Sequence, residues 1–195
     1  MSPLTLVTRL KRERHGATIV EFAIVAPVMM MLIMGLGDLL YQQYAQSILN
    51  GAVQKAARDS TIEAASTSTI DSRVQTMIQT VARNGTFSAT RRSYDSFTEV
   101  APEPFTDSNH NGVRDPGECY TDMNGNSQWD ADPGASGQGG ASDVTLYTAT
   151  VTYPRLFPVA GLLGWPSTQT VSASTLLKNQ PYAAQTTATN VTICT

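Results

Sequence analysis

The chain has 195 residues, of which 41% are hydrophobic and 15% are charged, and its formal net charge is -3. The hydrophobic fraction is too high for a wholly disordered chain. The near-neutral charge offers no general basic surface, so we expect no nucleic-acid partner. The length suits one domain of ordinary size, or a smaller domain joined to an anchor.

The first predicted element is an apolar segment over residues 17–37, about as long as a helix needs to cross a membrane. Basic residues are clustered in the leader before it, residues 1–16, and the next basic residue after it is Lys55. The positive-inside rule therefore predicts a cytoplasmic N-terminus and export of everything after Asp38.

Two simpler explanations of this segment remain open. A cleaved secretory signal peptide fits poorly, because its apolar region is usually about 7–15 residues long and ends at small residues. Here Ala23 and Ala26 lie before the midpoint of the run. A plain signal anchor explains the hydrophobicity and the charges. It does not explain Glu21, since a charge near the bilayer centre costs about 2.5–3.5 kcal/mol or more.

The surroundings of Glu21 resemble the processing signal of type IV pilin-like proteins. Gly16 ends the basic leader, Glu21 is the fifth residue after it, and Phe22 follows. The resemblance implies that a membrane prepilin peptidase cuts between Gly16 and Ala17. The amine freed on Ala17 can then neutralise a glutamate about one helical turn away, commonly that of a neighbouring subunit.

The segment after Gly16 also resembles the TadE-like family, through its early proline and a later Ala-Ala-Arg: Pro27, Ala56, Ala57 and Arg58. The resemblance implies a minor pilin or pseudopilin with a structural role in a Tad (Flp-type) pilus or a related secretion apparatus. Its expected partners are the bacterial inner membrane, the prepilin peptidase and other pilus subunits. The expected topology is single-pass, with a domain that is periplasmic, or extracellular after assembly.

Residues 38–59 are predicted to continue the helix outside the membrane. Apolar residues recur there every three or four positions and form one stripe: Tyr41, Ala45, Ile48, Leu49, Ala52, Val53 and Ala56. We therefore expect one helix over residues 17–59, with its first half in lipid and its second half against the exported domain.

The exported domain, residues 60–195, is predicted to have an α+β fold with a small antiparallel sheet against the long helix. Asp71 is the expected N-cap of a second helix that ends at Asn84-Gly85. Alternating residues predict three strands, at 86–100, 143–153 and 169–177.

Three connecting segments carry separate expectations. Residues 134–142 are predicted to be a flexible Gly/Ser linker. Residues 154–166 are apolar and rich in turns, and we expect partial burial in the same subunit, with an exposed contact loop as the alternative. The tail after Pro181 is expected to be poorly ordered unless Cys194 holds it.

A calcium loop is predicted between the first two strands. Residues 107–118 match the twelve-residue EF-hand loop, with Gly112 at its sixth position and these expected ligands: Asp107, Asn109, Asn111, Val113, Asp115 and Glu118. A weaker copy starts 15 residues later, with Ser127 in place of glycine and Pro133 in place of glutamate. Asp132 is a possible substitute for that glutamate, so the weaker ligand set is Asp122, Asn124, Asn126, Gln128, Asp130 and Asp132.

The remaining motifs indicate structure and not catalysis. The two cysteines, Cys119 and Cys194, are expected to form a disulfide if the chain is exported, and two separate thiols are the alternative. No nucleophile, phosphate-binding or zinc-protease motif occurs, so we expect no enzyme. The main alternative to a pseudopilin is a signal-anchored calcium-binding adhesion module whose leader is never removed.

Overall fold

The computed structural model describes residues 15–60, 66–157, 159–162, 164–181, 183–185 and 187–194. The fold divides into two compact units. One contains the described residues of Met1–Gln43 and Arg155–Thr168, and the other those of Tyr44–Pro154 and Gln169–Thr195. Except for His15 and Gly16, the predicted leader lies outside the described residues.

The long N-terminal helix is confirmed. Helix α2 runs over His15–Ser60, close to the predicted 17–59, with Pro27 inside it. Its first half is rich in Ala, Leu and Met, which favour helix. In its second half the residues of the predicted stripe are buried, which explains why the helix continues: Ala45, Leu49, Ala52, Val53 and Ala56.

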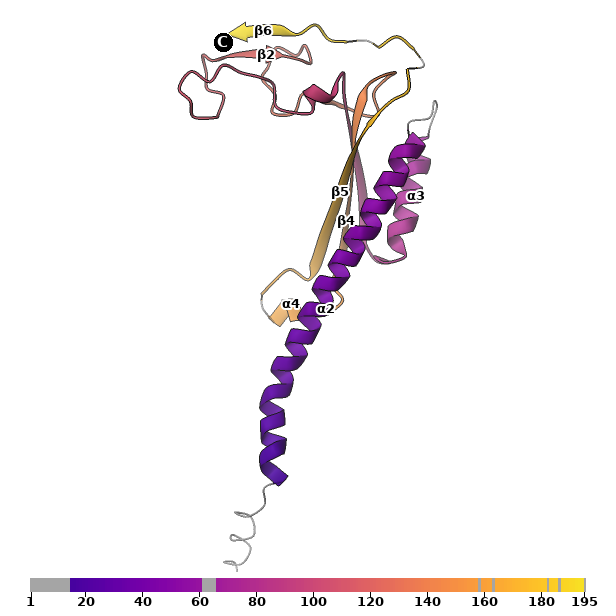
Figure 1. The fold of residues 1–195 in the computed structure, drawn as a ribbon, viewed down its shortest axis with the longest axis vertical. Helices are drawn as coiled ribbons and strands as arrows, with labels where there is room; N and C mark the ends of the chain where they lie inside the picture. Colours follow the sequence, from indigo (N-terminus) through magenta and orange to yellow (C-terminus); the bar gives the residue numbers. More distant parts are fainter. Residues whose placement is uncertain are drawn as a thin grey trace, which may run out of the picture. The chain divides into compact units, whose positions relative to one another are not determined.

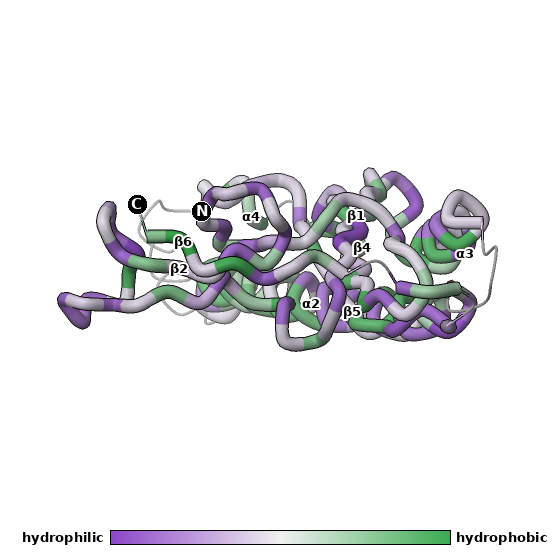
Figure 2. Tube along the Cα trace, turned by 90° about the horizontal axis from the view of Figure 1, so that it is seen from above, coloured by the Kyte–Doolittle hydropathy of each residue, from purple (hydrophilic) through white to green (hydrophobic). Residues whose placement is uncertain are grey.

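Helix α3 (Thr67–Gln79) lies beside the C-terminal half of α2 (Figure 1). It buries one side through Ile70, Val74 and Ile78, and Figure 2 shows both hydrophobic and hydrophilic residues along it. The helix begins four residues before the predicted N-cap. Ser66 caps it instead, because its side chain accepts a hydrogen bond from the N–H of Thr69 at 3.4 Å.

Asp71 therefore lies inside α3, where its carboxylate binds residues of the sheet. It accepts hydrogen bonds from the Arg91 guanidinium at 2.7 and 3.0 Å and from the Tyr147 hydroxyl at 2.8 Å. The sequence pattern predicted Asp71 as the N-cap, but Arg91 and Tyr147 bind its carboxylate, which therefore does not cap the helix. The helix also ends earlier than predicted, with Thr80 as its C-cap.

The α+β prediction with an antiparallel sheet is also confirmed. The main sheet has four strands in the order β3-β1-β4-β5, with the bounds β1 Thr86–Tyr94, β3 Ala135–Ser136, β4 Val144–Pro154 and β5 Thr168–Lys178. β1 ends earlier than predicted, because a short 3-10 helix, η1 (Phe97–Glu99), follows it.

Alternate residues of the central strand β4 form the buried face of the sheet. Tyr147, Ala149, Val151 and Tyr153 are buried, while the threonines at positions 148, 150 and 152 are partly exposed. The core of this unit therefore consists of these residues together with the apolar sides of α2 and α3.

A second, two-stranded sheet pairs β2 (Cys119–Asp122) with β6 (Val191–Cys194). Cys119 lies opposite Cys194 in its register. The sequence predicted a poorly ordered C-terminal tail unless Cys194 holds it. Cys194 is bonded to Cys119, and this part of the tail forms a paired strand. Before β6, Gln185 donates hydrogen bonds to Asp95 and Asp143.

Residues 134–142 differ from the predicted flexible linker. They include strand β3, and the Asn179 side chain donates hydrogen bonds of 2.8 Å to the carbonyls of Gln138 and Gly140. Composition alone suggested flexibility, but contacts with distant residues hold the segment in place.

Candidate functional site

The first half of α2 presents an exposed apolar surface. Among the described residues, one helix is long and apolar enough to span a membrane, over Thr18–Asp59, and none of its most apolar window is buried. Except for Met34, the large apolar side chains from Ile19 to Leu36 are at least 40% exposed. Glu21 and Phe22 are also exposed in this helix. The segment is a candidate single-pass membrane anchor.

The first predicted calcium loop, residues 107–118, is folded by its own side chains. The Asp107 carboxylate accepts backbone N–H groups four and five residues later, at 3.1 and 2.8 Å. The side-chain oxygens of Asn109 and Asn111 each accept the N–H two residues on, at 3.0 and 2.7 Å. Their amide nitrogens both donate to one Asp115 oxygen, at 2.7 and 2.8 Å. These hydrogen bonds connect four of the predicted ligand residues, Asp107, Asn109, Asn111 and Asp115, within one loop.

The second loop repeats this pattern with Asp122, Asn124, Asn126 and Asp130. Asp122 accepts backbone N–H groups three and five residues later, both at 2.7 Å. The two asparagines accept the N–H two residues on, at 3.1 and 2.7 Å, the latter from Gln128. They donate to one Asp130 oxygen at 2.9 and 2.6 Å. The weaker sequence match thus folds like the stronger one.

The backbone of the two loops also agrees. Positive φ angles occur at the fourth and sixth positions of each, namely His110 (60°) and Gly112 (76°), then Gly125 (75°) and Ser127 (62°). Ser127 therefore takes the left-handed conformation that glycine takes in the first loop, although a non-glycine residue adopts it less readily.

Glu118 closes the first loop. It is buried, and its two carboxylate oxygens accept the backbone N–H groups of Ser108 and Asp115 at 2.8 and 2.9 Å. The twelfth EF-hand position normally supplies a bidentate glutamate. Glu118 is therefore a buried carboxylate at the twelfth position of the first loop.

Glu103 closes the second loop in the same way, although it precedes both loops in the chain. It is only 1% exposed, and its oxygens accept the N–H groups of Met123 and Asp130 at 2.8 and 2.9 Å. These partners lie 15 residues after those of Glu118. The sequence interpretation missed Glu103 because it sought the closing acid after the loop, where Pro133 stands.

A 15-residue repeat in the sequence could have identified Glu103 as the closing acid. Residues 103–117 read EPFTDSNHNGVRDPG, and residues 118–132 read ECYTDMNGNSQWDAD. Each copy begins with glutamate, followed by an aromatic residue, threonine and the loop. Each glutamate closes the loop of the other copy. Glu118 begins the second copy and closes the first loop, whereas Glu103 begins the first copy and closes the second loop.

The segments before the two loops pair with each other in a symmetric way. The N–H of Thr106 donates to the carbonyl of Cys119, and the N–H of Thr121 donates to that of Pro104, both at 2.8 Å. These bonds are related by the same 15-residue shift. The two repeats thus form one paired unit with approximate two-fold symmetry.

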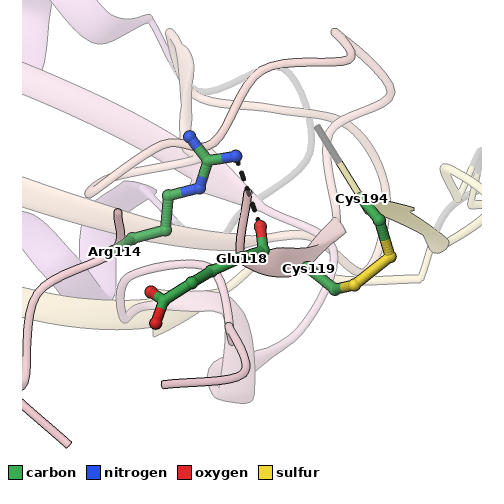
Figure 3. Close-up of a disulfide and its surroundings, with 4 residues drawn as sticks. All are labelled: Arg114, Glu118, Cys119 and Cys194. Carbon is green, nitrogen blue, oxygen red and sulfur yellow. Dashed lines mark hydrogen bonds between the residues drawn. A yellow bond between two sulfur atoms is a disulfide. The ribbon is translucent and has the colours of Figure 1, made fainter. Parts of the chain in front are cut away.

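The disulfide lies beside this pair. In Figure 3, Cys119 and Cys194 are joined by their sulfur atoms next to Glu118, whose carbonyl accepts a hydrogen bond from Arg114 at 3.3 Å. The bond links the strand between the two loops to the last strand of the chain. A cross-link between residues this far apart in sequence restricts the unfolded chain.

Asp132, the predicted substitute ligand, binds strand β1 instead. Its oxygens accept a hydrogen bond from the Tyr94 hydroxyl at 2.8 Å and pair with Arg92 at 3.1 Å. Both partners lie outside the loop. In this structure Asp132 joins the loop pair to the main sheet, while Glu103 takes the closing position.

Alkaline pH is expected to weaken this junction. Burial, followed by the hydrogen bond to Asp132, raises the pKa of Tyr94 from 10.0 to about 12. Because the folded state holds this proton more tightly than the unfolded state, the stabilisation is complete below pH 10.0 and is lost as the pH rises through about 12. We expect thermal unfolding in detergent to show that Tyr94→Phe loses less stability than the unchanged chain as the pH rises from 10.0 to about 12. Equal losses in both chains would contradict this contribution.

The chemistry of the paired loops is that of oxygen ligands. Among the described residues, no three His, Cys, Asp or Glu side chains form a metal-binding group by themselves. Each loop instead combines carboxylates with asparagine amides, which bind hard cations such as calcium through oxygen. The amides of Asn109 and Asn111 present nitrogen to Asp115.

Taken together, the described residues define an α+β protein carried by a candidate membrane helix. A protein-family model described as TadE-like protein matches residues 16–58, which is nearly all of α2. The match shows a likeness to TadE-like proteins over this segment, about a fifth of the chain. No curated protein and no solved structure matches the chain.

Proposed function

We propose that this chain is a TadE-like minor pilin or pseudopilin, processed after Gly16 and assembled through α2 into a Tad pilus or a related secretion apparatus. The family match begins at Gly16, the residue that precedes the proposed cut. The proposed role is structural and not catalytic.

One observation carries this proposal: a carboxylate at Glu21 lies within an otherwise apolar, exposed helix. A lone charge in lipid is costly, and an ion pair offsets part of that cost. Glu21 lies four residues after Ala17, so a new amine at Ala17 is about one helical turn away. The amine of a neighbouring subunit can approach the same exposed side chain. The carboxylate is then unfavourable in a single subunit and stabilised on assembly.

N-terminal sequencing of the chain from cells with and without the prepilin peptidase tests the processing step. We expect the mature chain to start at Ala17 only when the peptidase is present. An intact leader in both strains would instead support a signal-anchored adhesion module.

Substitution of Glu21 tests the assembly step. We expect Glu21→Gln to be processed normally but to lose incorporation into pili, measured by quantifying the chain in sheared surface fibres and in membranes. Glu13→Gln is the matched control, because that carboxylate belongs to the leader that cleavage removes. Equal incorporation of the Glu21→Gln and unchanged chains would overturn the proposed role of Glu21.

We also propose that the paired loops bind calcium, one ion in each. The favouring observation is that the two loops share hydrogen-bond pattern, φ signs and a buried closing glutamate, although their sequences differ at the sixth position. The four ion pairs of the described residues involve neither Glu103 nor Glu118. A cation at each loop would balance buried negative charge.

Calcium would have a structural role in this unit. The loop residues from 107 to 117 are exposed or only partly buried, so little apolar burial stabilises the segment. Ligation of several oxygens by one ion would replace that missing core. We expect affinity in the range of extracellular modules, on the order of 10⁻⁴–10⁻³ M.

A further inference from the structure

The apolar segment between β4 and β5 includes the short helix α4 (Val159–Leu162) and is buried on one side only. Val159 and Ala160 are 7% and 6% exposed. Three large apolar side chains face outward in the same segment: Leu156 is 57% exposed, Leu162 76% and Trp165 60%. This agrees with the predicted partial burial, and it leaves an apolar surface on a connecting loop.

The segment is attached to α2 near the predicted end of the membrane span. The ring of Phe157 packs so closely on Gly37 that a Cβ atom there would lie 2.9 Å from it. Arg155 forms an ion pair with Asp38, and both side chains are about 15% exposed. The guanidinium also donates to the carbonyl of Pro166 at 3.0 Å. These contacts place the segment against the helix within one compact unit.

An apolar groove of about 550 Å³ lies between the segment and α2. Its helix wall consists of Val28, Met31, Leu32, Gly35, Leu36, Asp38 and Leu39, and its other wall includes Phe157 and Trp165. All but two of these helix residues belong to the predicted span, 17–37. The groove is therefore continuous with the exposed apolar surface of the candidate anchor.

The charges and the backbone restrict the depth of this segment. An irregular loop exposed to lipid leaves backbone groups without partners in the hydrocarbon core, so it is tolerated only near the membrane surface. Tryptophan prefers the same interfacial layer. Pairing of Asp38 with Arg155 lowers the cost of holding two charges there. Moving the exposed apolar side chains of the segment out of water is favourable.

We propose that residues 155–167 form a second membrane contact. Their exposed side chains insert into the interfacial layer of the leaflet on the exported side, and the groove against α2 holds a lipid acyl chain. This inference rests on the proposed anchoring of α2 in the membrane. It adds a second point, besides the membrane helix, at which the chain contacts the bilayer.

The fluorescence of Trp165 tests the inference in the full chain, reconstituted into vesicles of phosphatidylethanolamine and phosphatidylglycerol. The chain has two tryptophans, so the difference between the unchanged chain and Trp165→Phe isolates the Trp165 signal. Trp165 is 60% exposed, so this conservative change removes little buried surface. Flotation of the chain with the vesicles measures membrane anchoring independently of the Trp165 signal.

We expect the chain to float, and lipids brominated near the headgroup to remove most of the Trp165 emission, with deeper bromines removing less. We expect Leu162→Asp to reduce this quenching. We expect Leu176→Asp, at an exposed leucine on β5, to leave it unchanged.

A floating chain whose Trp165 is quenched by aqueous iodide only would overturn the second contact while leaving the anchor intact. Shielding from both quenchers would mean that protein covers the segment, and would also overturn it. Failure to float would overturn both the anchor and this inference.

Discussion

Glu103→Ala is expected to abolish calcium binding by the second loop while the first loop still binds. The change removes a proposed bidentate ligand and leaves the partly buried N–H groups of Met123 and Asp130 without their acceptor. Each unsatisfied group costs about 1–3 kcal/mol. Calorimetric titration of the detergent-solubilised chain with calcium is expected to change from two binding sites to one. Limited proteolysis is expected to show that calcium no longer protects residues 122–132.

Two comparisons make this experiment specific. Asp132→Ala removes the acid that the sequence alone suggested, but its carboxylate binds Tyr94 and Arg92, so we expect calcium binding to persist. Glu118→Ala is expected to remove the first site instead. The calcium proposal fails if digestion is the same with calcium and with a chelator. The assignment of Glu103 fails if Asp132→Ala alone removes the second site.

Leu49→Ala is expected to destabilise the exported unit by about 2–5 kcal/mol, the range for removing a buried leucine side chain. Leu49 is 0% exposed and belongs to the stripe of α2 that packs in the core. Chemical denaturation in detergent micelles, monitored by near-ultraviolet circular dichroism, measures the loss.

Leu176→Ala on β5 is the matched control for this change. Its side chain is 45% exposed, and we expect a loss within about 0.5 kcal/mol, as for most surface substitutions. If both variants lose the same stability, the second half of α2 does not form part of the core.

Local patterns were sufficient to predict the long helix and the main strands. The helix is evident from the apolar run and from the stripe that includes Leu49, because helical periodicity is a property of neighbouring residues. The strand over 143–153 is evident from alternation, and the structure places it at Val144–Pro154. The twelve-residue spacing of the first loop likewise depends on residues close together in sequence.

The start of α3 and the order of residues 134–142 required the tertiary structure. Asp71 has the chemistry of an N-cap, but Arg91 and Tyr147 hold its carboxylate, and Ser66 caps the helix. The glycine-rich segment lacks a stabilising pattern of its own. Asn179 supplies its hydrogen bonds from more than thirty residues away.

The sequence by itself determined the elements whose causes lie within a few residues: an apolar helix with one acid, the alternating strands, and an oxygen-rich loop closed by its own glutamate. Only the tertiary structure decided which distant groups meet. It placed Glu103 at the second loop, Asp132 at β1 and the β4–β5 segment against α2. The physical reason is that a buried polar group must find a partner wherever the folded chain provides one, and sequence distance does not limit that choice.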